Sequence, residues 1–133
     1  MAPLIYLDTH ALVWLYAGQV DRIPPIARSF LETRDLVVSP MALVEVAYLI
    51  EIGRFTASVD ALVETLGRDL GLAICDLPFD VVAHHARRQT WTRDPFDRLI
   101  VGQAAARETL LLTKDQTIRD NYPQALWSKR PQG

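Results

Sequence analysis

Residues 4–18, LIYLDTHALVWLYAG, contain the pattern on which the fold prediction rests. The apolar run at 4–7 is too short for a helix and does not alternate with polar residues, which is typical of a strand buried on both faces. Asp8 follows, and then a helix-compatible segment at 11–17 that Gly18 closes. The stretch therefore predicts a strand and then a helix, with an acid at their junction.

The same unit recurs along the chain. Further short apolar runs lie at 36–38, 72–75 and 110–112, and a last short strand is predicted near 125–127. Helix-compatible segments separate these runs, at 24–34, 40–52, 59–70, 79–89 and 95–108. Strands that alternate with helices predict an α/β fold: a three-layer α/β/α sandwich with a central, mostly parallel sheet of four to five strands and right-handed crossovers.

The composition is that of one globular domain. The 133 residues are 50% apolar and 23% charged, so we expect a single domain over 1–133, with a frayed polar tail at 128–133. The formal charge of −2 gives no overall basic field, so any nucleic-acid contact must be local. Cys75, the only cysteine, sits in an apolar run and is predicted to be a core residue. With no basic leader and no apolar run long enough to span a bilayer, a cytoplasmic protein is expected.

Acidic residues follow two of the predicted strands. Asp8 comes after the first strand, and Asp115 comes after the run at 110–112. Ligands of open parallel sheets collect beyond the carboxyl ends of the strands, so both acids are expected at one rim. Glu45 is the only charged residue between Asp35 and Glu51 and is flanked by apolar residues. Burying such a carboxylate is costly, so we expect something positive to meet it.

The stretch RDPFDRLIVGQAA, residues 93–105, adds two more aspartates. Asp94 before Pro95 is typical of a helix N-cap. Asp97, at the third helical position, has two interpretations: a capping-box residue that answers the helix end, or a member of an acidic site. Asp8 and Asp115 have the same alternative, since each can cap a following helix or turn.

Taken together, four acids can converge at one rim of the sheet: Asp8, Glu45, Asp97 and Asp115. Close carboxylates repel one another, so some must hold protons or the site must bind a cation. Hard ions such as Mg²⁺ or Mn²⁺ prefer oxygen ligands and need no histidine or cysteine. Such sites commonly hydrolyse phosphodiesters. Thr9 and Thr113 adjoin two of the acids and are predicted to support them by hydrogen bonds, as Asp94 is predicted to border the pocket.

The blocks LDTHALVWL, SPMALVEVAYLIEIGRF, RDPFDRLIVGQA and LLTKDQTI resemble the PIN-domain family, and specifically the VapC-type ribonuclease toxins of toxin-antitoxin pairs. The resemblance covers nearly the whole chain. It implies an acidic site at Asp8, Glu45, Asp97 and Asp115, and a Mg²⁺- or Mn²⁺-dependent endoribonuclease that cleaves RNA, often tRNA or ribosomal RNA. One departure is Ala42, where members often carry a small hydroxyl residue.

The resemblance also implies a homodimer and a cognate antitoxin whose C-terminal segment lies in a groove between the first helices. Candidates for the groove are Trp14, Leu15, Tyr16, Tyr48, Leu49, Ile52 and Phe55. Ordinary core packing explains about half of them equally well.

RNA contacts are predicted at a loose basic cluster with a possible stacking residue: Arg87, Arg88, Trp91, Arg93, Arg98 and Lys114. A solvated helix end explains the same residues as well. His10, near Asp8, is expected to be a rim residue rather than a base or ligand.

Two other classes of function stay open. A PIN-like module can keep the fold and bind a partner without cleaving anything, although the intact acidic set argues against it. A phosphoacceptor domain also carries aspartates at strand ends. The dehalogenase type needs a second acid two residues after Asp8, where this chain has His10. The receiver type could use Asp76, but it needs an acidic pair after the first strand, and none is present.

Overall fold

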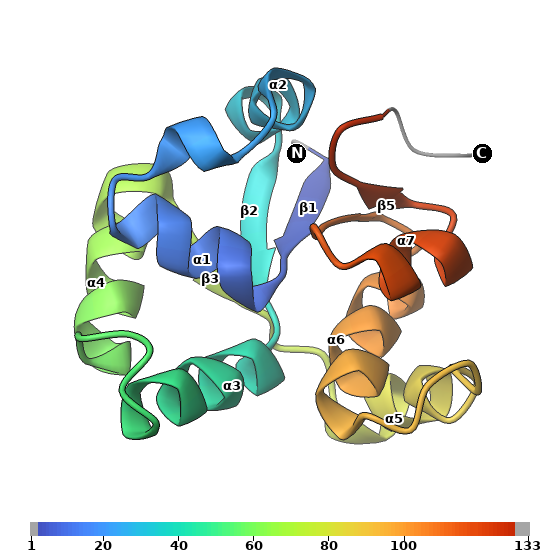
Figure 1. Ribbon diagram of the computed structural model, residues 1–133. Helices are drawn as coiled ribbons and strands as arrows, with labels where there is room; N and C mark the ends of the chain where they lie inside the picture. Colours follow the sequence, from blue (N-terminus) through green and yellow to red (C-terminus); the bar gives the residue numbers. More distant parts are fainter. Residues whose placement is uncertain (1–2, 130–133) are drawn as a thin grey trace.

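The computed structural model describes residues 3–129 (Figure 1). Within them, one parallel sheet contains five strands: β1 (Leu4–Leu7), β2 (Asp35–Val38), β3 (Ala73–Ile74), β4 (Leu110–Leu112) and β5 (Ala125–Leu126). The strand order is β3-β2-β1-β4-β5. The chain builds outward from β1 in one direction and then from β4 in the other, so the order reverses between β1 and β4. The predicted α/β fold with a parallel sheet is confirmed.

Helices cover both faces of this sheet. They are α1 (Thr9–Tyr16), α2 (Pro25–Thr33), α3 (Pro40–Glu51), α4 (Val59–Leu70), α5 (Phe79–Ala86), α6 (Pro95–Ala106) and α7 (Gln116–Asn121), with a 3-10 turn η1 (Val20–Arg22) after α1. Helices α1, α3 and α4 contact one another, and α5 packs on α6 (Figure 1). In the part of the chain that the structure describes, none of these helices has both the length and the apolar character needed to cross a bilayer.

The prediction of a fully buried strand at 72–75 is wrong. The strand β3 is only two residues long, and both Ala73 and Ile74 are exposed. The reason is its position at the edge of the sheet, where it pairs with β2 alone. Cys75, just beyond it, is buried as predicted, and its Sγ lies 3.0 Å from the Tyr6 hydroxyl.

The central strands form the floor of the core. Three residues of β1 and all three residues of β4 are buried, which matches their continuous apolar sequences. Helix α6 is held close to α5 at Gly102, where an added Cβ would lie 2.9 Å from the backbone nitrogen of Ala86. Only glycine permits this approach, so Gly102 fixes the position of the helix that carries Asp97.

Two predicted helices end earlier in the structure, and the segment at 79–89 is helical only as far as Ala86. The segment at 95–108 ends as a helix at Ala106, and Glu108 has a positive φ of 50°. The predicted polar tail at 128–133 lies outside the described residues from position 130 onward, while Ser128 and Lys129 are exposed.

Candidate functional site

Two of the predicted acids follow the two neighbouring strands at which the strand order reverses. Asp8 comes directly after β1, and its backbone N–H donates to the carbonyl of Leu112, the last residue of β4, over 2.9 Å. Asp115 lies three residues beyond Leu112 and begins α7. The two acids therefore leave the sheet at the same rim, where parallel sheets collect their ligands.

Asp8 is almost fully buried, and both of its carboxylate oxygens accept hydrogen bonds. Oδ1 accepts from the backbone N–H of Thr9 over 2.7 Å, and Oδ2 accepts from the Thr113 hydroxyl over 2.6 Å. Asp8 is the N-cap of α1, so the capping interpretation holds for this residue and does not remove it from the rim. Burial raises the pKa of Asp8 more strongly than these two hydrogen bonds lower it.

Asp115 also caps a helix while lying at the rim of the sheet. Its carboxylate accepts from the N–H of Ile118 over 3.0 Å and so caps α7, a helix that the sequence analysis treated only as a turn. Its own N–H donates to the Thr113 hydroxyl over 3.1 Å. Thr113 thus links Asp115 to Asp8, and this hydroxyl holds the two acids in a fixed relation.

Glu45 projects from α3 and is partly buried. The Thr9 hydroxyl donates a hydrogen bond to its carboxylate. The expected positive partner is not supplied by the described residues, among which Glu45 forms no ion pair. Burial raises the pKa of Glu45, and the charges of Asp8, Asp94 and Asp115 raise it further.

The pKa of Asp97 is raised by all the other acids of the site. Burial and the negative charges of its neighbours raise its pKa to about 7. Those neighbours, in decreasing order of effect, are Asp94, Asp115, Asp8 and Glu45. The acids that raise it come from the ends of β1 and β4, from α3 and from the start of α6. The structure therefore brings the four predicted acids into one electrostatic cluster.

Asp94 begins α6, as predicted, by accepting from the N–H groups of Phe96 (2.8 Å) and Asp97 (3.4 Å). The N–H of Asp94 itself donates to the Thr92 hydroxyl over 3.1 Å. This N–H is the group that a capping-box residue at position 97 would bond. The capping-box bond predicted for Asp97 is therefore absent, and its charge interacts with the start of α6 only through its place in the first turn.

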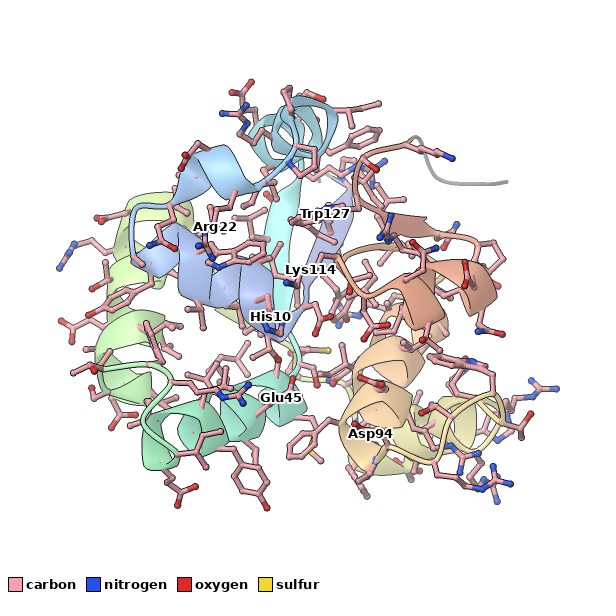
Figure 2. The ribbon with its side chains drawn as sticks, in the orientation of Figure 1. His10, Arg22, Glu45, Asp94, Lys114 and Trp127 are labelled. Atoms are coloured by element: carbon pink, nitrogen blue, oxygen red, sulfur yellow. The ribbon has the colours of Figure 1, made fainter. Side chains whose placement is uncertain are left out.

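The cluster contains only oxygen donors suited to a hard cation: four carboxylates and the hydroxyls of Thr9 and Thr113. In their present conformations, no three Asp, Glu, His or Cys side chains between positions 3 and 129 gather closely enough to hold an ion. The donor chemistry fits Mg²⁺ or Mn²⁺. Figure 2 shows Glu45 on α3 and Asp94 at the start of α6, with His10 and Lys114 above them.

The basic residues predicted to touch RNA lie in different settings. The Nε of Arg98 donates to the carbonyl of Gln89 over 2.9 Å, so its guanidinium braces the loop between α5 and α6. Trp91 is partly buried and donates from its ring to the side chain of Gln89 over 2.9 Å. Arg93 is exposed, as are Arg87 and Arg88. Lys114 is exposed beside the acids.

Two cations and two further rings surround Trp14. The Lys114 ammonium lies 5.2 Å and the Arg22 guanidinium 5.4 Å from the centroid of the Trp14 ring, within cation–π range. The Trp127 ring centroid is 5.8 Å from that of Trp14, and the ring of His10 is 5.9 Å away. The members come from both ends of the chain, and no local pattern in the sequence links them.

The predicted groove residues separate into buried and exposed sets. Trp14 is buried, and Tyr16 packs edge-on against Phe55 at 6.1 Å. Tyr48 and Ile52 on α3 are 54% and 64% exposed, which makes them available to a partner, while Leu49 is half-buried.

A cavity of about 440 Å³ opens between α1, η1, α2 and α4. Its apolar lining includes Leu15, Tyr16, Val20, Leu31, Leu66 and Leu70. Among the predicted groove residues, only Leu15 and Tyr16 belong to it.

Comparisons with known proteins agree with this architecture. The family model for the PIN domain matches residues 5–122. A toxin-antitoxin complex from Klebsiella pneumoniae contains a chain of similar fold, with a TM-score of 0.66, 17% identity and coverage of 95% of this chain and 98% of that one. VapBC2 from Rickettsia felis bound to a promoter DNA fragment has a TM-score of 0.60 and 14% identity, and the match covers 93% of this chain and 98% of that one. DNA-bound VapBC from Salmonella typhimurium has a TM-score of 0.56 and 17% identity, with coverage of 94% of this chain and 96% of that one. A comparison with curated proteins gave no match.

The family match covers residues 5–122, which is most of the chain. The protein belongs to the PIN domain family.

Proposed function

We propose that this PIN domain is a Mg²⁺- or Mn²⁺-dependent endoribonuclease and the toxin of a toxin-antitoxin pair. The observation that carries the proposal is the cluster of Asp8, Glu45, Asp97 and Asp115, in which the pKa of Asp97 is raised to about 7. A protein that uses these acids only for capping has no need to bring them together. Perturbed carboxylates that converge on one rim are typical of a functional site.

The four carboxylates would hold the metal, and Asp97 and Glu45 are the members without a capping bond that competes for their oxygens. A bound divalent ion lowers the pKa of its water and stabilises the charge that develops on the phosphoryl oxygens. Thr113 keeps Asp8 in place through the hydroxyl bond of 2.6 Å, and Thr9 does the same for Glu45. Such supporting bonds orient ligands before the ion arrives.

The substrate we propose is cellular RNA, with tRNA or ribosomal RNA as the targets, cleaved in the cytoplasm with translation as the process inhibited. The support is the family membership together with the fold shared with chains of VapBC complexes. The second candidate is a PIN-like module that binds RNA or protein without cleaving it. The convergence of the acids favours the nuclease, because a binding module gains nothing from mutual repulsion of carboxylates.

Cleavage of RNA tests the proposal directly. Purified protein is incubated with total cellular RNA in Mg²⁺, in Mn²⁺ and in EDTA, and the 5′ and 3′ ends are mapped. The proposal predicts discrete ends with either metal and none in EDTA. Induced expression without a partner should arrest growth for the wild type and not for Asp8→Asn. Intact RNA with both metals would favour the binding module.

The antitoxin is proposed to bury an apolar segment in the cavity between α1, α2 and α4. Leu70 lines this cavity and is 46% exposed, so Leu70→Lys should weaken antitoxin binding at least about tenfold with little loss of stability. Ile74 is 45% exposed, does not line the cavity and provides the matched control as Ile74→Lys. Equal affinities of the two variants, measured by calorimetry, would contradict this groove.

A homodimer is also proposed. Exposed apolar side chains on α3 and α5, which include Val44, Ile52 and Phe79, supply a surface for a second copy. Sedimentation of the wild type and of Phe79→Glu tests this: a dimer that becomes a monomer in the variant is expected, and a wild-type monomer at all concentrations would contradict it.

A further inference from the structure

A second cavity lies between α7 and the segment that follows β5. It has a volume of about 400 Å³, and its polar and aromatic lining consists of Gln116, Arg119, Asp120, Trp127, Ser128 and Lys129. In Figure 1, α7 and β5 lie on the opposite side of the molecule from α4. The volume is within the range of small-ligand sites, and the lining combines two cations with one carboxylate.

Arg119 points to the kind of ligand. Its Nη2 donates to the carbonyl of Lys114 over 3.0 Å, which fixes the guanidinium against the loop beside the acidic site. Its Nε is buried and has no hydrogen-bond partner among the described residues. Buried donors nearly always have an acceptor, so this N–H calls for one beyond the residues that the structure describes, and a ligand in the cavity can supply it. Arg119 and Lys129 together favour an anionic acceptor, and a phosphate suits the donor geometry of arginine.

The carboxylate of Asp120 is already engaged. It accepts from the side-chain amide of Gln116 over 2.7 Å and so lies along the exposed side of α7. Its negative charge nevertheless faces the same cavity and opposes an anionic ligand. The variant Asp120→Asn should therefore bind an anionic ligand more tightly, because it removes this negative charge. Its amide oxygen can still accept the hydrogen bond from Gln116.

Trp127 connects the cavity to the acidic site. Its ring forms one wall of the cavity and lies 5.8 Å from that of Trp14, which carries Arg22 and Lys114 within cation–π range. Lys114 directly precedes Asp115 in the chain. Trp127, Trp14 and Lys114 thus link the cavity to the rim of the acids, and Figure 2 shows Trp127, Lys114 and His10 one below another.

We propose that this cavity binds one nucleotide of a single-stranded RNA, next to the bond that the acids would cleave. The base stacks on Trp127, and the adjoining phosphate accepts from Arg119 and Lys129. Aromatic rings combined with a basic track are the features that bind single strands without a sequence requirement. Arg119 lies four residues after Asp115, about 6 Å along the helix axis, so a strand held here also reaches the acids. The identity of the strand rests on the proposed nuclease function.

Binding is measured without cleavage, in EDTA, from the fluorescence anisotropy of a short labelled single-stranded oligoribonucleotide. Trp127→Leu and Lys129→Glu should each bind at least about fivefold more weakly than wild type. Asp120→Asn should bind more tightly, a gain that misfolding cannot produce. Arg68→Glu, an exposed charge reversal on α4, is the control and should match wild type.

A second probe separates nucleotide recognition from simple charge attraction. Inorganic polyphosphate offers phosphates without bases, so Lys129→Glu should weaken its binding and Trp127→Leu should leave it unchanged. Equal losses for Trp127→Leu with both probes, or affinities of all cavity variants equal to that of Arg68→Glu, would overturn the proposal. Failure of the nuclease function would appear separately, as RNA that is bound through this cavity in EDTA but stays intact when metal is added.

Discussion

Replacing Asp97 with asparagine should stabilise the metal-free protein at alkaline pH, although it removes a central acid. The pKa of Asp97 is raised from 3.8 to about 7 in the folded protein. If Asp97 were fully shielded from solvent, a pKa of 3.8 in the unfolded chain and about 7 in the folded protein would lower the free energy of unfolding by about 4 kcal/mol above pH 7. Asp97 is partly exposed, so screening reduces the effect to about 1–2 kcal/mol. Loss of a negative charge from the first turn of α6 offsets about 0.3–1 kcal/mol of the gain.

The sign of the pH dependence follows from proton binding. The folded protein holds the Asp97 proton more tightly than the unfolded chain, so wild-type stability falls as the pH rises from about 4 to about 7. Asp8 and Glu45, whose pKa values are also raised, contribute in the same direction in both proteins. Asp97→Asn removes only the part of this pH dependence that Asp97 contributes. The variant should therefore equal wild type near pH 4 and exceed it by about 1 kcal/mol near pH 8.

Urea unfolding in EDTA, followed by circular dichroism at both pH values, measures this difference. Adding Mg²⁺ or Mn²⁺ at pH 8 should then raise the stability of the wild type more than that of Asp97→Asn, since an ion that binds only the folded state stabilises it by mass action. A variant less stable than wild type at pH 8 in EDTA would refute the crowding of carboxylates on which the site is built.

Two further substitutions test the surroundings of the site by the same unfolding assay. Thr113→Val leaves Asp8 without its hydroxyl donor and should lower stability by about 1.5–3 kcal/mol, whereas Thr113→Ser keeps the hydroxyl and should cost less than about 1 kcal/mol; equal losses would count against the bond. Gly102→Ala drives a methyl group into the backbone of Ala86 and should lower stability by about 1–3 kcal/mol. Gly67→Ala is the control, because its added Cβ would lie 3.5 Å from the nearest atom, and it should be neutral or stabilising by up to about 1 kcal/mol. A loss of stability in Gly67→Ala as large as that in Gly102→Ala would contradict the close approach of α5 and α6.

The sequence was informative wherever apolar runs and acids alternated. The run at 4–7 followed by Asp8, and the run at 110–112 followed by Asp115, predicted two strand ends at one rim, and the structure adds that β1 and β4 are neighbours. The cap at Asp94 was also readable, because Pro after Asp is a local signal. These features depend on residues close together in the chain.

Features that depend on distant residues were not predicted. Helix α7 is short and largely polar, so it carries no apolar period. The exposure of β3 follows from its place at the sheet edge, which composition does not reveal. The contact of Trp14 with Trp127 joins opposite ends of the chain. Arg98 was predicted to contact RNA because it adjoins Asp97. In the structure its guanidinium donates to the backbone carbonyls of Gln89 and Arg87, which lie far from it in the sequence.

The central claim is that the clustered acids serve metal-dependent cleavage, and the two aspartates around Pro95 test it most directly. Asparagine caps a helix as well as aspartate does, so Asp94→Asn preserves the start of α6. Asp97→Asn changes one carboxylate of the cluster and should also leave the fold intact. Initial rates of RNA cleavage in Mn²⁺ should fall at least about a hundredfold for Asp97→Asn and less than about tenfold for Asp94→Asn. Equal rates for wild type and Asp97→Asn would contradict the account.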